Sequence, residues 1–122
     1  LEKKLLITGW INDPMEFREL FKIAMHLSRW EGFGLVLPEY MIARKPIIAT
    51  KVDAIPNIIK DHENGLLVKV DDIDDIVRAV MEIYDNDMLV NKLVKNGFKD
   101  VHNLFDAERV AKEHQSIFQG LL

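Results

Sequence analysis

The chain has 122 residues, of which 48% are hydrophobic and 30% are charged, and its formal net charge is −4 at pH 7. This length and hydrophobic content predict one globular domain with a buried core. The acidic balance argues against a general nucleic-acid binder, which would show a basic patch. The sequence has no cysteine, which excludes disulfides and thiolate metal sites, and it has no signal-peptide pattern and no apolar run of membrane-spanning length.

The first half of the sequence alternates short apolar runs with turn signals. Residues 5–8 are typical of a short buried strand, which Gly9 ends. Asp13 and Pro14, a capping residue and a favoured first helical residue, predict a helix that continues to about residue 23. The next expected elements are a strand and a helix, at 24–28 and 35–43.

The second half continues this alternation and then becomes helical. A strand, a short helix and another strand are expected at 45–50, 55–61 and 65–70. Asp71 or Asp72 caps the next helix, in which apolar residues recur at helical spacing: Ile73, Ile76, Val77, Val80, Ile83 and Tyr84. Two further helices are expected at 88–102 and 106–119. Short connections and nearly continuous apolar strands predict an α/β fold, with a Rossmann-like, doubly wound parallel sheet between flanking helices.

The most informative part of the sequence surrounds Glu31. This acid lies in a turn with Gly32 and Gly34, a helix is expected to begin at about Leu35, and Glu39 lies one turn into that helix. Glycines let a backbone approach a ligand closely, and a helix start offers unpaired N–H groups with a partial positive charge, which suits phosphate. Carboxylates beside such a site suit hydroxyl groups, which donate hydrogen bonds to them. The pattern therefore predicts a ligand with phosphate at its centre and sugar hydroxyls on both sides, that is, a nucleotide-sugar.

This part of the sequence resembles a signature of the retaining glycosyltransferases that have two Rossmann-like domains (the GT-B type), specifically family 4, also called glycosyl transferase group 1. The signature of their C-terminal domain has the form S-x-x-E-G-F-G-L-x-x-x-E and here occupies residues 28–39. A small-residue helix and a P-V-I-A-T strand follow it in that family and correspond here to residues 40–43 and 46–50. Further segments that match in the same order are 55–59, 64–68 and 71–87.

The resemblance implies roles for individual residues. Glu31 is the catalytic candidate and would bind and position the hydroxyl groups of the transferred sugar, while Glu39 would bind the ribose hydroxyls. The donor-binding set is Gly32, Phe33, Gly34, Leu35, Val36 and Glu39. Within this set, the backbone amides of residues 34–36 would contact the diphosphate. Trp30 and Phe33 could form a wall of the ligand site or pack in the core.

The resemblance also implies what the whole protein does. Residues 1–122 would be part of the C-terminal, nucleotide-sugar-binding domain of an enzyme that transfers a sugar to a hydroxyl acceptor with retention of configuration. Catalysis would depend on positioning and on stabilisation of the departing diphosphate, without a metal or another cofactor. The acceptor would bind an N-terminal domain outside this sequence. The implied location is the cytoplasm, with peripheral attachment to a membrane through that other domain.

The number of strands departs from the implied fold. A doubly wound sheet of this type has the order 3-2-1-4-5-6, and the four expected strands would be its third to sixth. The sheet would therefore lack its first two strands, and three explanations stay open: the chain is a fragment, its strands pair differently, or another chain completes the sheet. Exposed strand edges recruit other chains, so we expect this chain alone to self-associate and to transfer no sugar.

Two other functions stay open at this point. The main alternative is a non-catalytic Rossmann-like binding or assembly module that another chain completes. A weaker alternative is a signalling domain of the receiver type, which needs a phosphoacceptor aspartate at a strand end. Among the expected strand ends only the last offers an aspartate, Asp71, which is already explained as a helix cap.

Four further features bear on the interpretation of the site. Arg44 stands where many family members have glycine, and a left-handed conformation there would cost an arginine roughly 1 kcal/mol relative to glycine. Asp53 and Ala54 stand where many members have a glycine pair, so their side chains would narrow the space for a ligand and change the donor sugar. His26, at a strand end, is interpreted as a partly buried structural histidine. The acidic residues from 71 to 75 are interpreted as helix capping and not as a cation site.

Overall fold

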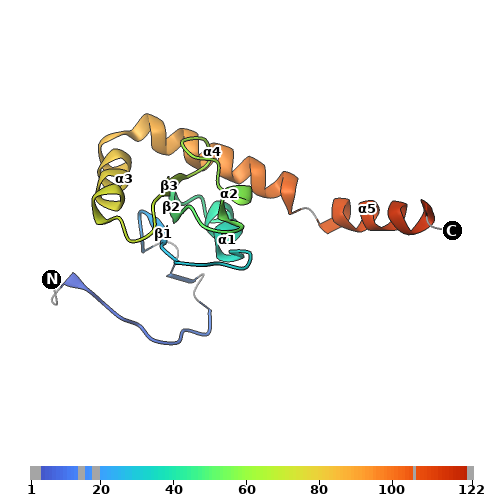
Figure 1. Cartoon of the computed structure of the whole chain (residues 1–122), viewed down its shortest axis with the longest axis horizontal. Helices are drawn as coiled ribbons and strands as arrows, with labels where there is room; N and C mark the ends of the chain where they lie inside the picture. Colours follow the sequence, from blue (N-terminus) through green and yellow to red (C-terminus); the bar gives the residue numbers. More distant parts are fainter. Residues whose placement is uncertain (1–3, 14–15, 18–19, 106, 121–122) are drawn as a thin grey trace.

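The computed structural model describes residues 4–13, 16–17, 20–105 and 107–120 (Figure 1). Strands and helices alternate along the chain until β3, and helices follow. The elements are β1 (Ala24–His26), α1 (Val36–Ile42), β2 (Ile47–Thr50), α2 (Ile55–Ile58), β3 (Leu66–Val68), α3 (Ile73–Asp85), α4 (Asp87–Leu104) and α5 (Ala107–Gly120).

The three strands form a parallel sheet in the order β1-β2-β3. In this sheet Ile48 of β2 lies opposite Met25 of β1 and Leu66 of β3. Helices connect consecutive strands, as parallel pairing requires. The expected α/β fold with a Rossmann-like parallel sheet and flanking helices is therefore confirmed. The three strands are the fourth, fifth and sixth of the expected order, and they keep that adjacency.

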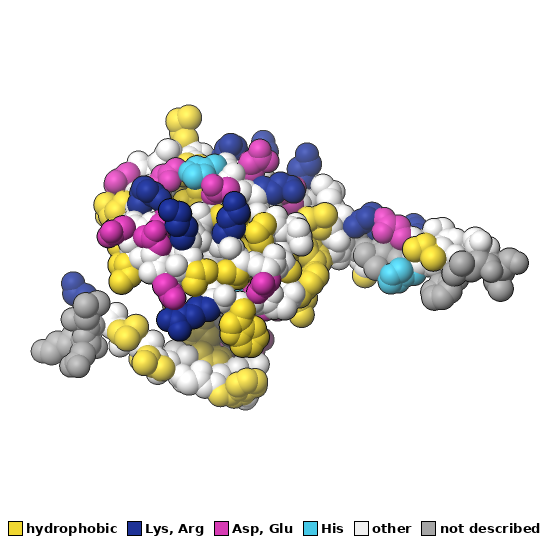
Figure 2. Space-filling view, in the orientation of Figure 1, with side chains coloured by type: hydrophobic (Ala, Val, Ile, Leu, Met, Phe, Trp, Pro, Cys, Tyr) yellow, Lys and Arg dark blue, Asp and Glu magenta, His cyan; other side chains and the backbone are white. Residues whose placement is uncertain are grey.

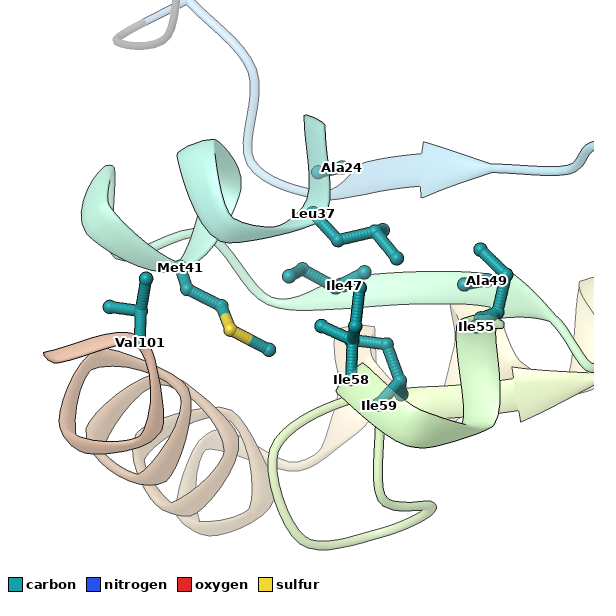
Figure 3. Close-up of a cluster of buried hydrophobic side chains, with 9 residues drawn as sticks. All are labelled: Ala24, Leu37, Met41, Ile47, Ala49, Ile55, Ile58, Ile59 and Val101. Carbon is teal, nitrogen blue, oxygen red and sulfur yellow. The ribbon is translucent and has the colours of Figure 1, made fainter. Parts of the chain in front are cut away.

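Both faces of the central strand β2 are covered, because all four of its residues are buried. Ile47 and Ala49 point to one side, where α1 and α2 pack on the sheet (Figure 3). Ile48 points to the other side and packs with Ala79 and Ile83 of α3. This alternation follows from the two-residue period of a strand.

Helix α4 joins the two sides of the core. Leu93, in its first half, packs in the cluster that contains α3, and Val101, near its end, packs beside Met41 of α1 (Figure 3). Gly97 lies between them along the helix, and a Cβ there would lie 3.3 Å from the Met41 side chain. The two helices therefore approach each other closely at this glycine.

The N-terminal part of the chain differs from the prediction. Residues 5–8 form no strand, and Leu6 and Ile7 are more than four-fifths exposed. A strand is stable only when neighbouring strands pair its N–H and C=O groups, and no strand of the described chain lies next to this segment. The first residues of the segment run apart from the main body (Figure 1), whereas Thr8 lines a pocket beside α1.

The helix expected at 13–23 is also not confirmed. Residues 14, 15, 18 and 19 of that range lie outside the described residues. Glu16 and Phe17 form a short 3-10 turn, and residues 20–23 have no helical structure. The described residues of this range therefore contain no α-helix, despite the apolar residues and the capping signal.

The C-terminal helices follow the prediction closely. Asp72 caps α3, because its side chain accepts a hydrogen bond from the Asp75 amide at 3.0 Å.

Arg44 has φ 55°, which confirms the left-handed conformation after α1. Its guanidinium lies 3.8 Å from the ring centre of Phe98, and this cation–π contact helps to stabilise the arginine there. Helix α5 extends away from the body (Figure 1).

Two expectations from the sequence concern a basic surface patch and a membrane-spanning segment. On the face seen in Figure 2, acidic and basic side chains are interspersed, and no large basic patch is present on that face. Among the described residues, no helix combines the length and the apolar character needed to span a membrane.

Candidate functional site

The candidate site lies at the carboxyl ends of the strands, where open α/β sheets bind their ligands. Strand β1 ends at His26, and a turn then leads through Glu31 to α1. The Nε2 atom of His26 lies 2.7 Å from Oε2 of Glu31 and 3.2 Å from Oγ of Ser28. The side chains of His26 and Glu31 are 19% and 24% exposed. His26 and Glu31 therefore form a partly buried pair beside the sheet.

The environment of Glu31 favours its ionised form. The hydrogen bond from His26 is the largest cause that lowers the pKa of Glu31, and the charge of that ring acts in the same direction. Partial removal from water opposes this shift, while hydrogen bonds from the amides of Gly34 and Phe33 support it. The net pKa is below the ordinary value of 4.5, so Glu31 can accept hydrogen bonds from hydroxyl groups at neutral pH.

Two residues at the end of β2 hold the backbone of this turn. The hydroxyl group of Thr50, which is buried, donates a hydrogen bond to the C=O of Ser28 at 2.5 Å. The carboxylate of Asp53 accepts a hydrogen bond from the Glu31 N–H at 2.8 Å. Asp53 has φ 41°, a left-handed conformation. From the sequence, Asp53 is expected only to narrow the space for a ligand, and its contact with the Glu31 backbone is a finding of the structure.

The start of α1 depends on Gly34. This residue has φ 77°, and a Cβ would lie 3.2 Å from the Leu37 side chain and 3.3 Å from that of Ile55. Gly34 therefore combines a conformation that favours glycine with a position where a Cβ would make unusually tight contacts. The residue that caps α1, Leu35, makes no side-chain hydrogen bond to the first amides of the helix.

Gly32 differs from Gly34. A Cβ at Gly32 would meet no atom within 4 Å, so the protein itself does not require glycine there. The absent side chain leaves open space beside the turn. Phe33 packs edge-to-face against Phe105, with ring centres 6.1 Å apart, whereas Trp30 is 80% exposed. The structure thus places Phe33 partly against the protein and leaves Trp30 in solvent.

Glu39 lies on α1, apart from the turn that holds Glu31. It lines a pocket together with Thr8, Ile11, Phe17, Phe21, Val36 and Tyr40. The residues that line this pocket do not include Glu31. In the chain, Glu31 thus precedes α1 and Glu39 lies in its first turn.

The acidic residues after β3 serve helix capping and pairing. Asp71 pairs with Arg29 at 3.1 Å. Besides the cap from Asp72, Asp75 accepts a hydrogen bond from the Lys69 amide at 2.8 Å and pairs with Arg78. Throughout the part of the chain that the structure describes, no three His, Asp or Glu side chains are grouped closely enough to hold a metal ion. The capping interpretation is confirmed for Asp72, whereas Asp71 and Asp75 pair with basic side chains.

Comparison with known proteins connects this geometry with one family. Residues 1–100 match the family of glycosyl transferases group 1. The chain is 25% identical over 121 residues to a poly(ribitol-phosphate) alpha-N-acetylglucosaminyltransferase of Staphylococcus aureus (strain COL), which covers 98% of this chain and 24% of that protein. It spans about a quarter to a third of the length of the first curated relatives that it matches.

Solved structures agree with this match. The C-terminal domain of LpcC, a glycosyl transferase group 1 family protein of Francisella tularensis, superposes with a TM-score of 0.70 at 33% identity, over 80% of this chain and 51% of that chain. HepE of Anabaena, in complex with UDP, superposes with a TM-score of 0.90 at 18% identity, over 98% of this chain and 33% of that chain. The second likeness concerns the fold alone. Together with the match over residues 1–100, these likenesses show that the chain belongs to the glycosyl transferases group 1 family.

Proposed function

We propose that this chain is the donor-binding part of a retaining family 4 glycosyltransferase, which transfers a sugar from a nucleotide-sugar to a hydroxyl group of an acceptor. The observation that carries the proposal is the position of Glu31. Its carboxylate lies 2.7 Å from the ring of His26 at the carboxyl end of the sheet, in the turn that leads to α1, and this contact lowers its pKa. A carboxylate in this place accepts hydrogen bonds from sugar hydroxyls beside a phosphate-binding end of a helix.

In this proposal each part of the site binds one part of the donor. The amides of Gly34, Leu35 and Val36 bind the diphosphate, and Glu39, on the other side, binds the ribose hydroxyls. Glu31 binds and positions the transferred sugar, which occupies the open space beside Gly32. Phe33 supports the turn through its contact with Phe105, the residue that follows α4.

Catalysis in this proposal depends on positioning and charge. The helix start and its amides stabilise the charge that develops on the departing diphosphate, and Glu31 orients the sugar without forming a covalent bond to it. We propose that no divalent cation is required. The acidic residues after β3 do not serve the donor, because they cap α3 and pair with Arg29 and Arg78.

The remaining parts of the activity belong to the longer protein that the proposal implies. The chain covers about a quarter to a third of its first relatives, so we place the acceptor site on an N-terminal domain outside this sequence. A cytoplasmic location, with peripheral attachment to a membrane through that domain, is part of the same proposal. A non-catalytic assembly module is not favoured, because the family is one of transferases.

The direct test uses the full-length protein as its gene encodes it. It is incubated with a panel of UDP-, GDP- and ADP-sugars and a mixture of hydroxyl acceptors, and the product is analysed by NMR. We expect transfer from one class of donor, with the anomeric configuration of the donor retained. A product of inverted configuration would contradict the retaining mechanism, and no transfer from any donor would contradict the proposed function.

A further inference from the structure

The carboxylate of Asp53 reaches the candidate site from another part of the chain. Asp53 follows β2, and its Oδ2 atom accepts the hydrogen bond of the Glu31 N–H at 2.8 Å across 22 residues of sequence. Asp53 adopts the left-handed conformation, which few residues other than glycine, asparagine and aspartate accept. The contact therefore connects the loop after β2 with the backbone of the residue that we propose binds the sugar.

The loop that carries Asp53 is anchored at both ends. Thr50, before it, and Ile55, after it, are both buried. The N–H of Ile55 donates a hydrogen bond to the C=O of Val52 at 2.9 Å, which closes a turn around Asp53. The Ile55 side chain also packs against Gly34 at the start of α1. The carboxylate of Asp53 is thus presented by a segment that the core fixes in place.

Glu31 is consequently fixed at two points. Its side chain contacts His26, and its backbone N–H contacts Asp53. Thr50 adds a third contact three residues earlier in the turn, at the C=O of Ser28. A carboxylate that is fixed in this way needs little rearrangement when a ligand arrives, and such preorganisation increases affinity.

We propose that Asp53 is a positioning residue for the donor sugar, which holds the backbone of Glu31 so that its carboxylate meets the sugar hydroxyls without reordering the turn. This inference rests on the proposed function. It gives Asp53 a role that depends on a hydrogen-bond acceptor and not on a negative charge. The effect should be confined to ligands that carry a sugar, because the diphosphate and the ribose contact α1 and not Glu31.

The experiment compares three variants of the full-length protein. Asp53→Gly removes the acceptor and suits φ 41°, so it introduces no backbone strain. Asp53→Asn keeps an oxygen acceptor and removes the charge. Asp71→Gly is the matched control, because Asp71 also has a positive φ, 58°, and its carboxylate contacts the Arg29 side chain outside the turn backbone.

Two measurements are made on each variant. Hydrogen–deuterium exchange of the ligand-free protein reports the opening of the segment that contains the Glu31 amide. Calorimetry gives the affinity for the preferred nucleotide-sugar and for the matching nucleoside diphosphate. We expect Asp53→Gly to exchange faster at this segment and to bind the nucleotide-sugar about tenfold more weakly, with the diphosphate affinity unchanged. Asp53→Asn should stay within about threefold of the wild type, and Asp71→Gly should change neither measurement.

Several results would overturn the inference. One is unchanged exchange in Asp53→Gly, and another is an equal loss of affinity for both ligands. A third is an Asp53→Asn variant that behaves like Asp53→Gly, which would mean that the charge matters and not the acceptor. A wild-type protein that binds no nucleotide-sugar would overturn the proposed function together with this inference. Normal wild-type binding without a selective effect of Asp53→Gly would overturn this inference alone.

Discussion

The ring of His26, at the end of β1, lies 2.7 Å from the carboxylate of Glu31, five residues later in the turn. The two side chains face each other because the turn folds back toward the strand that precedes it. The contact keeps the pKa of Glu31 below its ordinary value. His26 is therefore more than a structural histidine of the strand, because it contacts the carboxylate proposed to bind the sugar and lowers its pKa.

This contact predicts how donor binding depends on pH. The ordinary pKa of a glutamate is 4.5, and the pKa of Glu31 is lower. Glu31 therefore stays mostly ionised when the pH falls to 4.5. In His26→Ala the largest cause of the shift is removed, so the pKa rises and Glu31 becomes protonated at a higher pH. We expect the affinity for the nucleotide-sugar to fall at a higher pH in His26→Ala than in the wild type, as measured by calorimetry between pH 4 and 7. His26→Gln, which keeps an N–H donor, is the control. If the affinity falls at the same pH in His26→Ala as in the wild type, the proposed effect of His26 on Glu31 is wrong.

A second prediction concerns the two glycines of the turn. Gly34→Ala introduces a side chain at φ 77°, 3.2 to 3.3 Å from the Leu37 and Ile55 side chains. We expect it to lower the free energy of unfolding by about 1–3 kcal/mol. Gly32→Ala, which meets no atom within 4 Å, should change it by less than about 0.5 kcal/mol. Urea unfolding measures both, and equal destabilisation by the two variants would show that the described turn geometry is wrong.

A third prediction concerns divalent cations. Because the start of α1 and its amides are proposed to stabilise the diphosphate, donor binding and sugar transfer should be unchanged in excess chelator. The assay compares the full-length protein before and after treatment with EDTA. If activity disappears and Mg²⁺ or Mn²⁺ restores it, a metal shares this role and the proposal is wrong on this point.

A fourth prediction concerns residues 1–122 expressed alone, which we expect to self-associate and to transfer no sugar. Within the described chain, β1 pairs only with β2, so its other edge presents unpaired backbone groups. The outer edge of β3 is different, because the amides of Leu67 and Lys69 donate hydrogen bonds to Asp61 and Asp75, at 2.8 Å each. Association should therefore use β1.

Sedimentation of the isolated chain tests this expectation. The Ala24 amide donates a hydrogen bond toward β2, at Pro46, so the next amide, that of Met25, points to the open edge. Met25→Pro removes that donor and should weaken the association without breaking the pairing with β2. A monomeric wild-type chain that transfers sugar would contradict both expectations.

Much of this fold could be predicted from the sequence because local signals and tertiary packing agree. Strand β2 is an uninterrupted apolar run that is buried on both faces, and α3 has an aspartate cap before apolar residues at helical spacing. Residues 5–8 carried an equally apolar signal, but a strand also needs neighbours to pair with, and the run has none among the described residues. Composition alone could not show this.

In the candidate site, too, some features could be predicted from the sequence and others could not. Gly34 and Glu31 could be found because glycine and acid occur in a recognisable order before a helix. The contacts of Glu31 with His26 and Asp53 could not, because they depend on how the turn folds back and on a loop 22 residues away. One signal for Asp53 was present, since an acid replaces a glycine that many family members have. It was interpreted as a steric obstacle, whereas the structure shows a hydrogen-bond acceptor.

The central claim is that Glu31 binds the transferred sugar and Glu39 the ribose. Calorimetry on the full-length protein tests it most directly, with Glu31→Ala and Glu39→Ala titrated against a nucleotide-sugar and against the matching nucleoside diphosphate. We predict that Glu39→Ala weakens both ligands by about tenfold, whereas Glu31→Ala weakens the nucleotide-sugar by about tenfold and leaves the diphosphate unchanged. Equal losses for the free diphosphate in both variants would contradict the account.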